Sequence, residues 1–225
     1  MDLSIFRNQS GILNVDEYDY MKIAIVGNGS IGSFLALALN KLGFKNLILI
    51  DDDKIEKHNV PTQFYFNTDI GKYKVNALNN YLEGNITTFV NKVKPNHKMN
   101  ADVVFICVDS LKQRKIILNA ILTSYEEYNK PKLIIDGRMH RLIFRVFTLS
   151  LKNTDLLKNY IEGLLDDEYE GDCTEKGIIQ NVFAVVAVMV EQFKKVVNGE
   201  PYSDLVNCDF EQYLFIQSAK LGVEK

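Results

Sequence analysis

The sequence predicts an α/β fold, in which a doubly wound and mainly parallel sheet carries helices on both faces and has an additional antiparallel C-terminal portion. Two observations support this prediction. Short apolar runs alternate with segments of helical period between residues 21 and 136, which is typical of parallel strands joined by right-handed helical crossovers. After residue 136, two apolar runs follow each other with only a short connection between them, which indicates antiparallel pairing.

Strands are expected where a short, β-rich apolar run stops at a glycine or a polar cluster. The run that begins at Lys22 stops at Gly27, and the run at residues 46–50 stops at three aspartates. The expected strands are 22–26, 46–50, 86–93, 102–108, 132–136, 142–150 and 213–217.

Helices are expected where apolar residues share one helical face and a terminating residue follows. Residues 31–42 have such a face, and Gly43 supplies the left-handed position that ends the helix. The other expected helices are residues 70–82, ended by Gly84; residues 111–125; a helix capped by Asn153 or Thr154 with apolar residues from 156 to 165; and residues 177–198, ended by Gly199. Residues 166–172 are expected to form an exposed acidic loop.

The composition is that of an average globular protein, because 47% of the 225 residues are hydrophobic and 24% are charged. A net charge of -3, from 26 basic and 29 acidic residues, argues against a general nucleic-acid binder. The three cysteines, Cys107, Cys173 and Cys208, form no CxxC pair, so neither a disulfide scaffold nor structural zinc is expected.

The sequence also predicts no membrane association. The longest apolar run, residues 182–190, is shorter than the roughly 20 residues that span a bilayer. Residues 1–11 lack the basic-then-apolar order of a signal peptide. We therefore expect a cytoplasmic location.

Residues 27–32 (GNGSIG) form a GxGxxG element between an expected strand and an expected helix. In this setting Gly27 permits a tight turn, Gly29 lets the backbone approach phosphate, and Gly32 lets the helix pack closely on the sheet. Asp51 ends the next strand, where its carboxylate can accept hydrogen bonds from ribose hydroxyls. The pattern predicts a nucleotide site, although a turn that binds nothing is the alternative interpretation.

Further residues favour a nucleoside triphosphate over NAD, the usual ligand of this motif. Residues 51–64 and 69–74 place many polar groups just past strand ends, where open α/β sheets bind ligands. Lys74 can direct an ammonium group to phosphate, and Asp109, which closes the strand at residues 102–108, can hold Mg²⁺ against phosphate oxygens. A dehydrogenase has no particular use for these two groups.

The GxGxxG element, the DxD followed by Asn59 and Gln63, the DIGxxK segment that ends at Lys74, and the strand-ending Asp109 together resemble the ThiF/MoeB/HesA family. These adenylyltransferases are related to ubiquitin-activating enzymes, and the resemblance covers most of residues 21–200. It implies a Rossmann-like ATP-binding fold in which the C-terminal carboxylate of a small ubiquitin-like protein or peptide attacks the α-phosphate, giving an acyl-adenylate and pyrophosphate. It also implies ATP and Mg²⁺ as cofactors and a homodimer.

The resemblance further implies a set of site residues. Asp51 would contact the ribose, and Asp109 would ligate Mg²⁺. The nucleotide-binding residues would be Gly27, Gly29, Ser30, Gly32, Asp51, Asp53, Asn59 and Lys74. The residues implied in catalysis are Lys74, Asp109, Asn59, Gln63, Arg7 and Cys173.

Two arginine positions decide how closely the chain follows the family. The family usually has arginine just before the glutamine, and here that position is Thr62, which cannot supply a guanidinium fork. Relatives also offer an arginine from the N-terminal segment of the partner subunit. Arg7 is the candidate for this role, with an ordinary surface arginine as the alternative.

Cys173 begins a Cys-x-x-x-Gly stretch that resembles the family's stretch at the start of a helix. Some relatives use cysteines in this part of the chain to accept the acyl group or in sulfur transfer. A helix N-terminus would lower the pKa of the thiol, but the acidic neighbours Asp172 and Glu175 oppose the thiolate. A cysteine that only helps to start the helix is therefore the favoured interpretation, and Cys107 is expected in the core.

The sequence has no internal repeat or low-complexity linker, so one domain is expected over residues 1–225. Its parts would be an N-terminal arm (1–20), a nucleotide-binding half (21–136) and a substrate and dimer half (137–225). Three functions remain open: the adenylyltransferase, an NAD-dependent oxidoreductase that uses the same glycine turn, and a non-catalytic dimeric scaffold that has lost the arginine at position 62.

Overall fold

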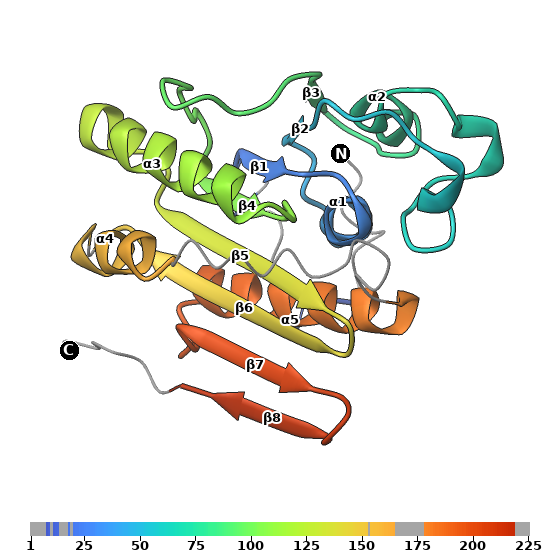
Figure 1. Cartoon of the computed structure of the whole chain (residues 1–225). Helices are drawn as coiled ribbons and strands as arrows, with labels where there is room; N and C mark the ends of the chain where they lie inside the picture. The colour runs from blue at the N-terminus through green and yellow to red at the C-terminus, as the bar shows by residue number, and fades with distance from the viewer. Residues whose placement is uncertain are drawn as a thin grey trace.

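The computed structural model describes residues 8, 9, 11–13, 18, 20–152, 154–164 and 178–218. Among these residues, eight strands form one sheet in the order β3-β2-β1-β4-β5-β6-β7-β8 (Figure 1). The strands are β1 (Ile23–Val26), β2 (Leu47–Ile50), β3 (Thr87–Phe89), β4 (Val103–Ile106), β5 (Leu133–His140), β6 (Ile143–Ser150), β7 (Leu205–Asp209) and β8 (Leu214–Gln217). Strands β3, β2, β1, β4 and β5 pair in parallel, and β5 to β8 pair antiparallel. The predicted fold class is confirmed.

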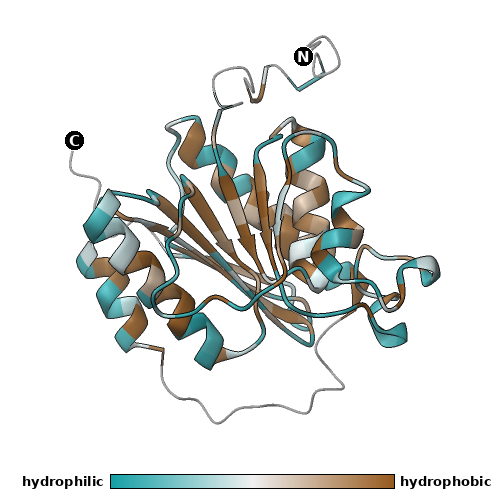
Figure 2. Cartoon of the chain, turned by 90° about the horizontal axis from the view of Figure 1, so that it is seen from above, coloured by the Kyte–Doolittle hydropathy of each residue, from teal (hydrophilic) through white to brown (hydrophobic). Residues whose placement is uncertain are grey.

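The described residues also form five α-helices, which cover both faces of the sheet. They are α1 (Ser30–Leu42), α2 (Lys74–Asn79), α3 (Leu111–Tyr128), α4 (Thr154–Glu162) and α5 (Ile179–Val197). Residues of α1 and α5 share one apolar core with the sheet, and residues of α3 and α4 share a second core on the opposite face. Figure 2 shows the apolar strands, in brown, between these helical layers.

Strand β1 illustrates why the sequence folds in this way. All four of its residues are buried, and successive side chains of a strand point to opposite faces. Ile23 and Ile25 therefore belong to the core beneath α1 and α5, whereas Ala24 and Val26 belong to the core beneath α3 and α4. A parallel strand covered on both faces requires a continuous apolar run, which is what the sequence provides.

The helix expected at residues 70–82 is wrong at both ends, because α2 begins only at Lys74 and ends at Asn79. The preceding residues pair instead with the loop that follows β2. The Ile55 amide donates to the Lys72 carbonyl (2.9 Å), and the Gly71 amide donates to the Ile55 carbonyl (2.8 Å). These bonds hold Gly71 at a φ of 88°, outside the helical region.

Strand lengths in the structure also differ from the prediction. Strand β3 stops at Phe89, and β5 continues past Asp136 to His140 because β6 pairs with it along its whole length. The prediction omits β7, in which buried and half-buried residues alternate and the buried Val206 and Cys208 face the core. The expected loop at 166–172 and the cap at Asn153 lie outside the described residues.

Crossing a bilayer requires a helix that is both long and apolar, and none of the helices in the described ranges meets this requirement.

The packing predicts unequal costs for two phenylalanines of α5. Phe193 is 1% exposed and contacts the rings of Phe44 and Phe105, whereas Phe183 is 54% exposed and contacts Phe34. Phe193→Ala should lower the free energy of unfolding by about 3–5 kcal/mol because it leaves a cavity. Phe183→Ala should cost about 1 kcal/mol or less. Urea denaturation followed by circular dichroism measures both, and equal losses would contradict this packing.

Candidate nucleotide-binding site

The turn after β1 is built around the close approach of two glycines. Gly27 has a φ of 86°, and a Cβ added there would lie 2.9 Å from the Cys107 carbonyl group. A Cβ added at Gly32 would lie only 1.9 Å from the Gly27 carbonyl oxygen. At Gly29 the nearest atom to such a Cβ is Nε2 of Gln63, 3.9 Å away. Gly27 and Gly32 therefore make the turn possible, and Gly29 leaves open space over the start of α1.

Asp51 holds this turn from the end of β2. Its Oδ2 accepts a hydrogen bond from the Asn28 amide (2.6 Å), and its Oδ1 accepts one from the Asp53 amide (2.8 Å). Burial raises the pKa of Asp51, and the positive charge of Lys74 opposes this shift. The hydroxyl of Tyr65 donates to the Asn28 carbonyl (2.7 Å), so the turn is braced from a second side.

Lys74 is the first residue of α2, and its ammonium lies beside these carboxylates. Its side chain is 8% exposed and donates to Oδ2 of Asp53 at 2.8 Å, whereas the Asp53 side chain is 60% exposed. The backbone N–H of Lys74 also donates to the Asp53 carbonyl (3.0 Å). The lysine is therefore held near the glycine turn by an ion pair with a largely hydrated carboxylate.

The loop that carries Asn59 and Gln63 is attached to the start of α1. The Ser30 hydroxyl donates to Oγ1 of Thr62 (3.4 Å), and the Phe64 amide donates to Oγ of Ser33 (2.9 Å). These two bonds bring Gln63 over the turn, where its Oε1 is buried without a hydrogen-bond partner. A buried amide oxygen without a partner is suited to a ligand group that donates a hydrogen bond.

Asn59 contributes to the shape of this loop. It is buried, and its Oδ1 accepts a hydrogen bond from the Glu56 amide (2.8 Å). Its carbonyl accepts hydrogen bonds from the amides of Thr62 and Gln63. In the structure Asn59 therefore organises the loop that presents Gln63.

Asp109 lies three residues past β4, at the same edge of the sheet as the glycine turn. The parallel register aligns Val26 with Ile106, and the Cys107 amide donates to the Val26 carbonyl (2.8 Å). The Asp109 side chain is exposed, and carboxylate oxygens are suitable ligands for Mg²⁺. Desolvation raises the pKa of Cys107 to about 12, so this neighbouring thiol stays protonated at neutral pH.

A second group of carboxylates is less suited to a cation. Ligand oxygens of Asp51, Asp52 and Asp53 lie within 4.8 Å of one another. Asp53 pairs with Lys74 at 2.8 Å, and Asp52 lies 3.8 Å from the ammonium of Lys92. Two lysines therefore already offset the charge of this group. Asp109 remains the metal ligand that the sequence predicts.

The structure brings together, at the carboxyl ends of β1, β2 and β4, all the expected site residues that it describes. Arg7 and Cys173 lie outside the described residues. The sequence interpretation missed Asn28, whose amide binds Asp51, and Arg114, which is 2% exposed. The sequence could have indicated Arg114, because this charged residue lies on the same apolar face of α3 as the buried Ile117, Leu118 and Ile121.

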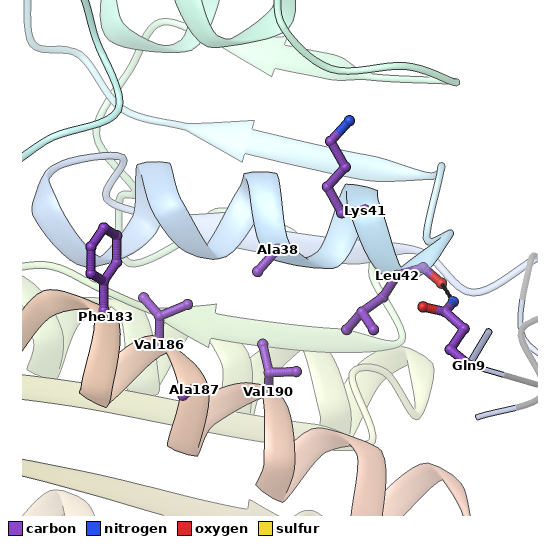
Figure 3. Close-up of a pocket in the computed structure, with 8 residues that line it drawn as sticks. All are labelled: Gln9, Ala38, Lys41, Leu42, Phe183, Val186, Ala187 and Val190. Carbon is purple, nitrogen blue, oxygen red and sulfur yellow. Dashed lines mark hydrogen bonds between the residues drawn. The ribbon is translucent and has the colours of Figure 1, made fainter. Parts of the chain in front are cut away.

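A separate hollow of about 400 Å³ lies between α1 and α5 (Figure 3). Its lining is mainly apolar and comes from the second half of α1, from α5 and from Gln9. The residues are Gln9, Ala38, Lys41, Leu42, Phe183, Val186, Ala187 and Val190. None of them belongs to the glycine turn, so this hollow is distinct from the candidate nucleotide site.

The strand order β3-β2-β1-β4-β5 and a glycine turn where the order reverses define a Rossmann-like α/β protein with a candidate nucleotide site. The ThiF family model matches residues 8–221, and the chain belongs to the ThiF family.

Curated relatives include ubiquitin-activating-type enzymes. The chain is 30% identical over 126 residues to ubiquitin-like modifier-activating enzyme 5 of Caenorhabditis elegans, covering 46% of this chain and 30% of the relative. It is 30% identical over 129 residues to the NEDD8-activating enzyme E1 catalytic subunit of Arabidopsis thaliana, covering 52% of this chain and 28% of the relative. The chain thus matches about a third or less of these relatives' lengths.

Solved structures share the fold at low sequence identity. PaaA superposes with a TM-score of 0.72 at 18% identity, over 97% of this chain and 82% of PaaA. E. coli MccB, crystallised with AMPCPP and MccA, superposes with a TM-score of 0.69 at 17% identity, over 91% of this chain and 65% of MccB. TcdA superposes with a TM-score of 0.66 at 17% identity, over 88% of this chain and 95% of TcdA.

The glycine geometry predicts different effects of two alanine substitutions. Gly32→Ala should lower the free energy of unfolding by about 3 kcal/mol, because its Cβ collides with backbone. Gly29→Ala meets no close atom and should cost about 1 kcal/mol or less, but its methyl group fills the space over the turn and should weaken ATP binding by at least about tenfold. Thermal unfolding and calorimetric titration measure these effects. Normal ATP affinity in a folded Gly29→Ala protein would place the phosphates elsewhere.

Proposed function

We propose that this protein is an ATP-dependent adenylyltransferase, which activates the C-terminal carboxylate of a small ubiquitin-like protein or peptide as an acyl-adenylate. The observation that best supports the proposal is that the glycine turn, Gln63 and Lys74 lie at one edge of the sheet in a ThiF-family chain, with Asp109 following the neighbouring strand β4 at the same edge. The names of the relatives and the MccB structure with MccA support a protein or peptide substrate.

The reaction joins two anions. A carboxylate oxygen of the substrate attacks the α-phosphorus of ATP, the bond from that phosphorus to the bridging oxygen breaks, and pyrophosphate leaves with the electron pair. Two unit charges about 4 Å apart repel by roughly 4 kcal/mol at an effective dielectric constant near 20. The site must therefore supply positive charge and fixed hydrogen-bond donors before the anions meet.

The chain has groups suited to this task. Backbone amides at the start of α1 can donate to phosphate oxygens above Gly29. The NH₂ group of Gln63 already lies nearest to the open space at Gly29 and can donate to a phosphate oxygen there. Lys74 would exchange its bond to Asp53 for one to a phosphate oxygen, and the exposed Asp53 carboxylate would stay hydrated. Mg²⁺ bound to Asp109 would neutralise charge on the phosphates.

The position of Thr62 favours a second candidate function. Its hydroxyl accepts a hydrogen bond from Ser30 at 3.4 Å, so this position offers the phosphates no guanidinium. A scaffold that binds ATP without chemistry would show the same geometry. Nucleotide titration combined with pyrophosphate–ATP exchange separates this scaffold from an adenylyltransferase.

We propose a homodimer in which Arg7 serves the partner's site. Nε2 of Gln9 donates to the Leu42 carbonyl (2.6 Å), at the end of α1 opposite the glycine turn. From Ser30 to Leu42 the helix axis spans about 18 Å at 1.5 Å per residue, so Gln9 is attached far from the glycine turn of its own subunit. Arg7 itself lies outside the described residues.

Pyrophosphate–ATP exchange tests the proposed activity. With Mg²⁺ and a substrate peptide, Lys74→Ala and Asp109→Asn should each lower exchange by at least about 100-fold, because each removes charge compensation in the transition state. Lys72→Ala and Asp102→Asn are matched controls, since Lys72 pairs with Asp69 and Asp102 accepts a hydrogen bond from Lys22 at the opposite end of β4. Both should retain exchange.

Nucleotide titration separates the alternatives. Tight NAD binding without any effect of Mg²⁺ would contradict the adenylyltransferase and support an oxidoreductase. ATP binding without exchange, for any candidate protein or peptide tested, would support the scaffold. Cys173→Ser should leave exchange intact, because adenylation precedes any transfer to a thiol.

Mixing two inactive variants tests the contribution of Arg7 to the partner's site. Arg7→Ala and Lys74→Ala proteins should each be inactive alone, because each homodimer lacks one essential cation in both sites. In reassociated mixtures, heterodimers contain one site with both residues intact, so exchange activity should reappear. Activity that stays absent after verified subunit exchange, or Arg7→Ala protein that is fully active, would contradict this arrangement.

A further inference from the structure

Asp109 is held by the first turn of α3, although its own side chain is exposed. Ser110 caps the helix, its Oγ accepting a hydrogen bond from the Gln113 amide at 3.2 Å. Nε2 of Gln113 donates to the Val93 carbonyl at 2.8 Å, in the segment between β3 and β4. The residues on the C-terminal side of Asp109 are thus tied to the segment between β3 and β4.

Arg114 fixes the residue on the other side of Asp109. Its side chain is 3% exposed, and Nη2 donates to the carbonyl of Val108, the residue directly before Asp109. Nη1 forms an ion pair with Asp136 on β5. Burial lowers the pKa of Arg114 to about 10, while the charge of Asp109 acts in the opposite direction, so the guanidinium remains charged at neutral pH.

Asp136 gives Arg114 a fixed point of attachment. It is fully buried and aligned with Ile106 of β4 in the parallel register. Its Oδ2 also accepts a hydrogen bond from the Tyr160 hydroxyl (2.5 Å) and lies 3.5 Å from Nη2 of Arg138. The guanidinium of Arg114 therefore links the residues after β4 to the Asp136 carboxylate, which Tyr160 of α4 and Arg138 of β5 hold in place.

We infer that Arg114 is a positioning residue for Asp109: it fixes the Val108 carbonyl, and with it the backbone that aims the Asp109 carboxylate at magnesium-bound ATP. This inference rests on the proposed function. A single exposed carboxylate pays the conformational entropy of ordering its own backbone and side chain whenever it binds a cation. Arg114 and the capped turn of α3 remove the backbone part of that cost in advance, as groups behind a metal ligand generally do.

Calorimetric titration of ATP with MgCl₂, and again with EDTA, tests this role. The measured quantity is the ratio of the two dissociation constants, which is the gain in affinity from Mg²⁺. Arg114→Met should reduce this gain by about tenfold or more, with ATP affinity in EDTA unchanged. Arg138→Met is the matched control, because it also removes a partner of Asp136, but Nη2 of Arg138 donates to Tyr160 and Asp136, whereas Nη2 of Arg114 donates to Val108. Arg138→Met protein should keep the wild-type gain in ATP affinity from Mg²⁺.

The two gains measured with the Arg114→Met and Arg138→Met variants support or overturn the role of Arg114. A gain that survives in folded Arg114→Met protein overturns the inference, and equal losses in both variants assign the effect to the charge balance of Asp136 and overturn it as well. If wild-type protein shows no gain from Mg²⁺, the proposed function fails, and this inference fails with it. If Arg114→Met does not fold, Arg114→Lys replaces it, because one ammonium keeps the charge beside Asp136 but lacks the fork that also reaches Val108.

Discussion

The contact between Gly32 and the carbonyl of Gly27 is the constraint on which the candidate site depends. It lets α1 begin directly after β1, because a side chain at either position would collide with backbone. The amides at the start of α1 are therefore placed at the sheet edge where the strand order reverses. Asp51 then ties β2 to this turn, and the parallel register places Asp109 beside it.

Charge balance at this edge relies on pairs rather than on isolated groups. Lys74 is nearly buried and takes its charge partner from the exposed Asp53, while Arg114 takes its partner from the fully buried Asp136. A bound ligand would affect these two ion pairs differently. A ligand can draw Lys74 away from a carboxylate that water will solvate, but Asp136 has no water to replace Arg114. The first pair is suited to exchange with a ligand, and the second to holding the backbone.

Much of the fold was predictable because the strands of a doubly wound sheet are continuous apolar runs and its helices carry one apolar face. The GxGxxG element and Asp51 were predictable for a similar local reason. The start of α2 was not, since residues 70–73 pair with a loop distant in sequence. Strand β7 was missed because a mixed run such as LVNCD forms a strand only beside β6. The pairing of Arg114 with Asp136 depends on the register of β4 and β5, which sequence spacing does not define.

We propose that this sheet edge neutralises the negative charge of a triphosphate. A crystal structure of the protein with ATP and MgCl₂ tests it most directly. We expect phosphate oxygens above Gly29, the Lys74 ammonium on a phosphate oxygen instead of on Asp53, and a cation between Asp109 and the phosphates. Nucleotide bound elsewhere, or Lys74 still paired with Asp53 while the triphosphate occupies the turn, would contradict it.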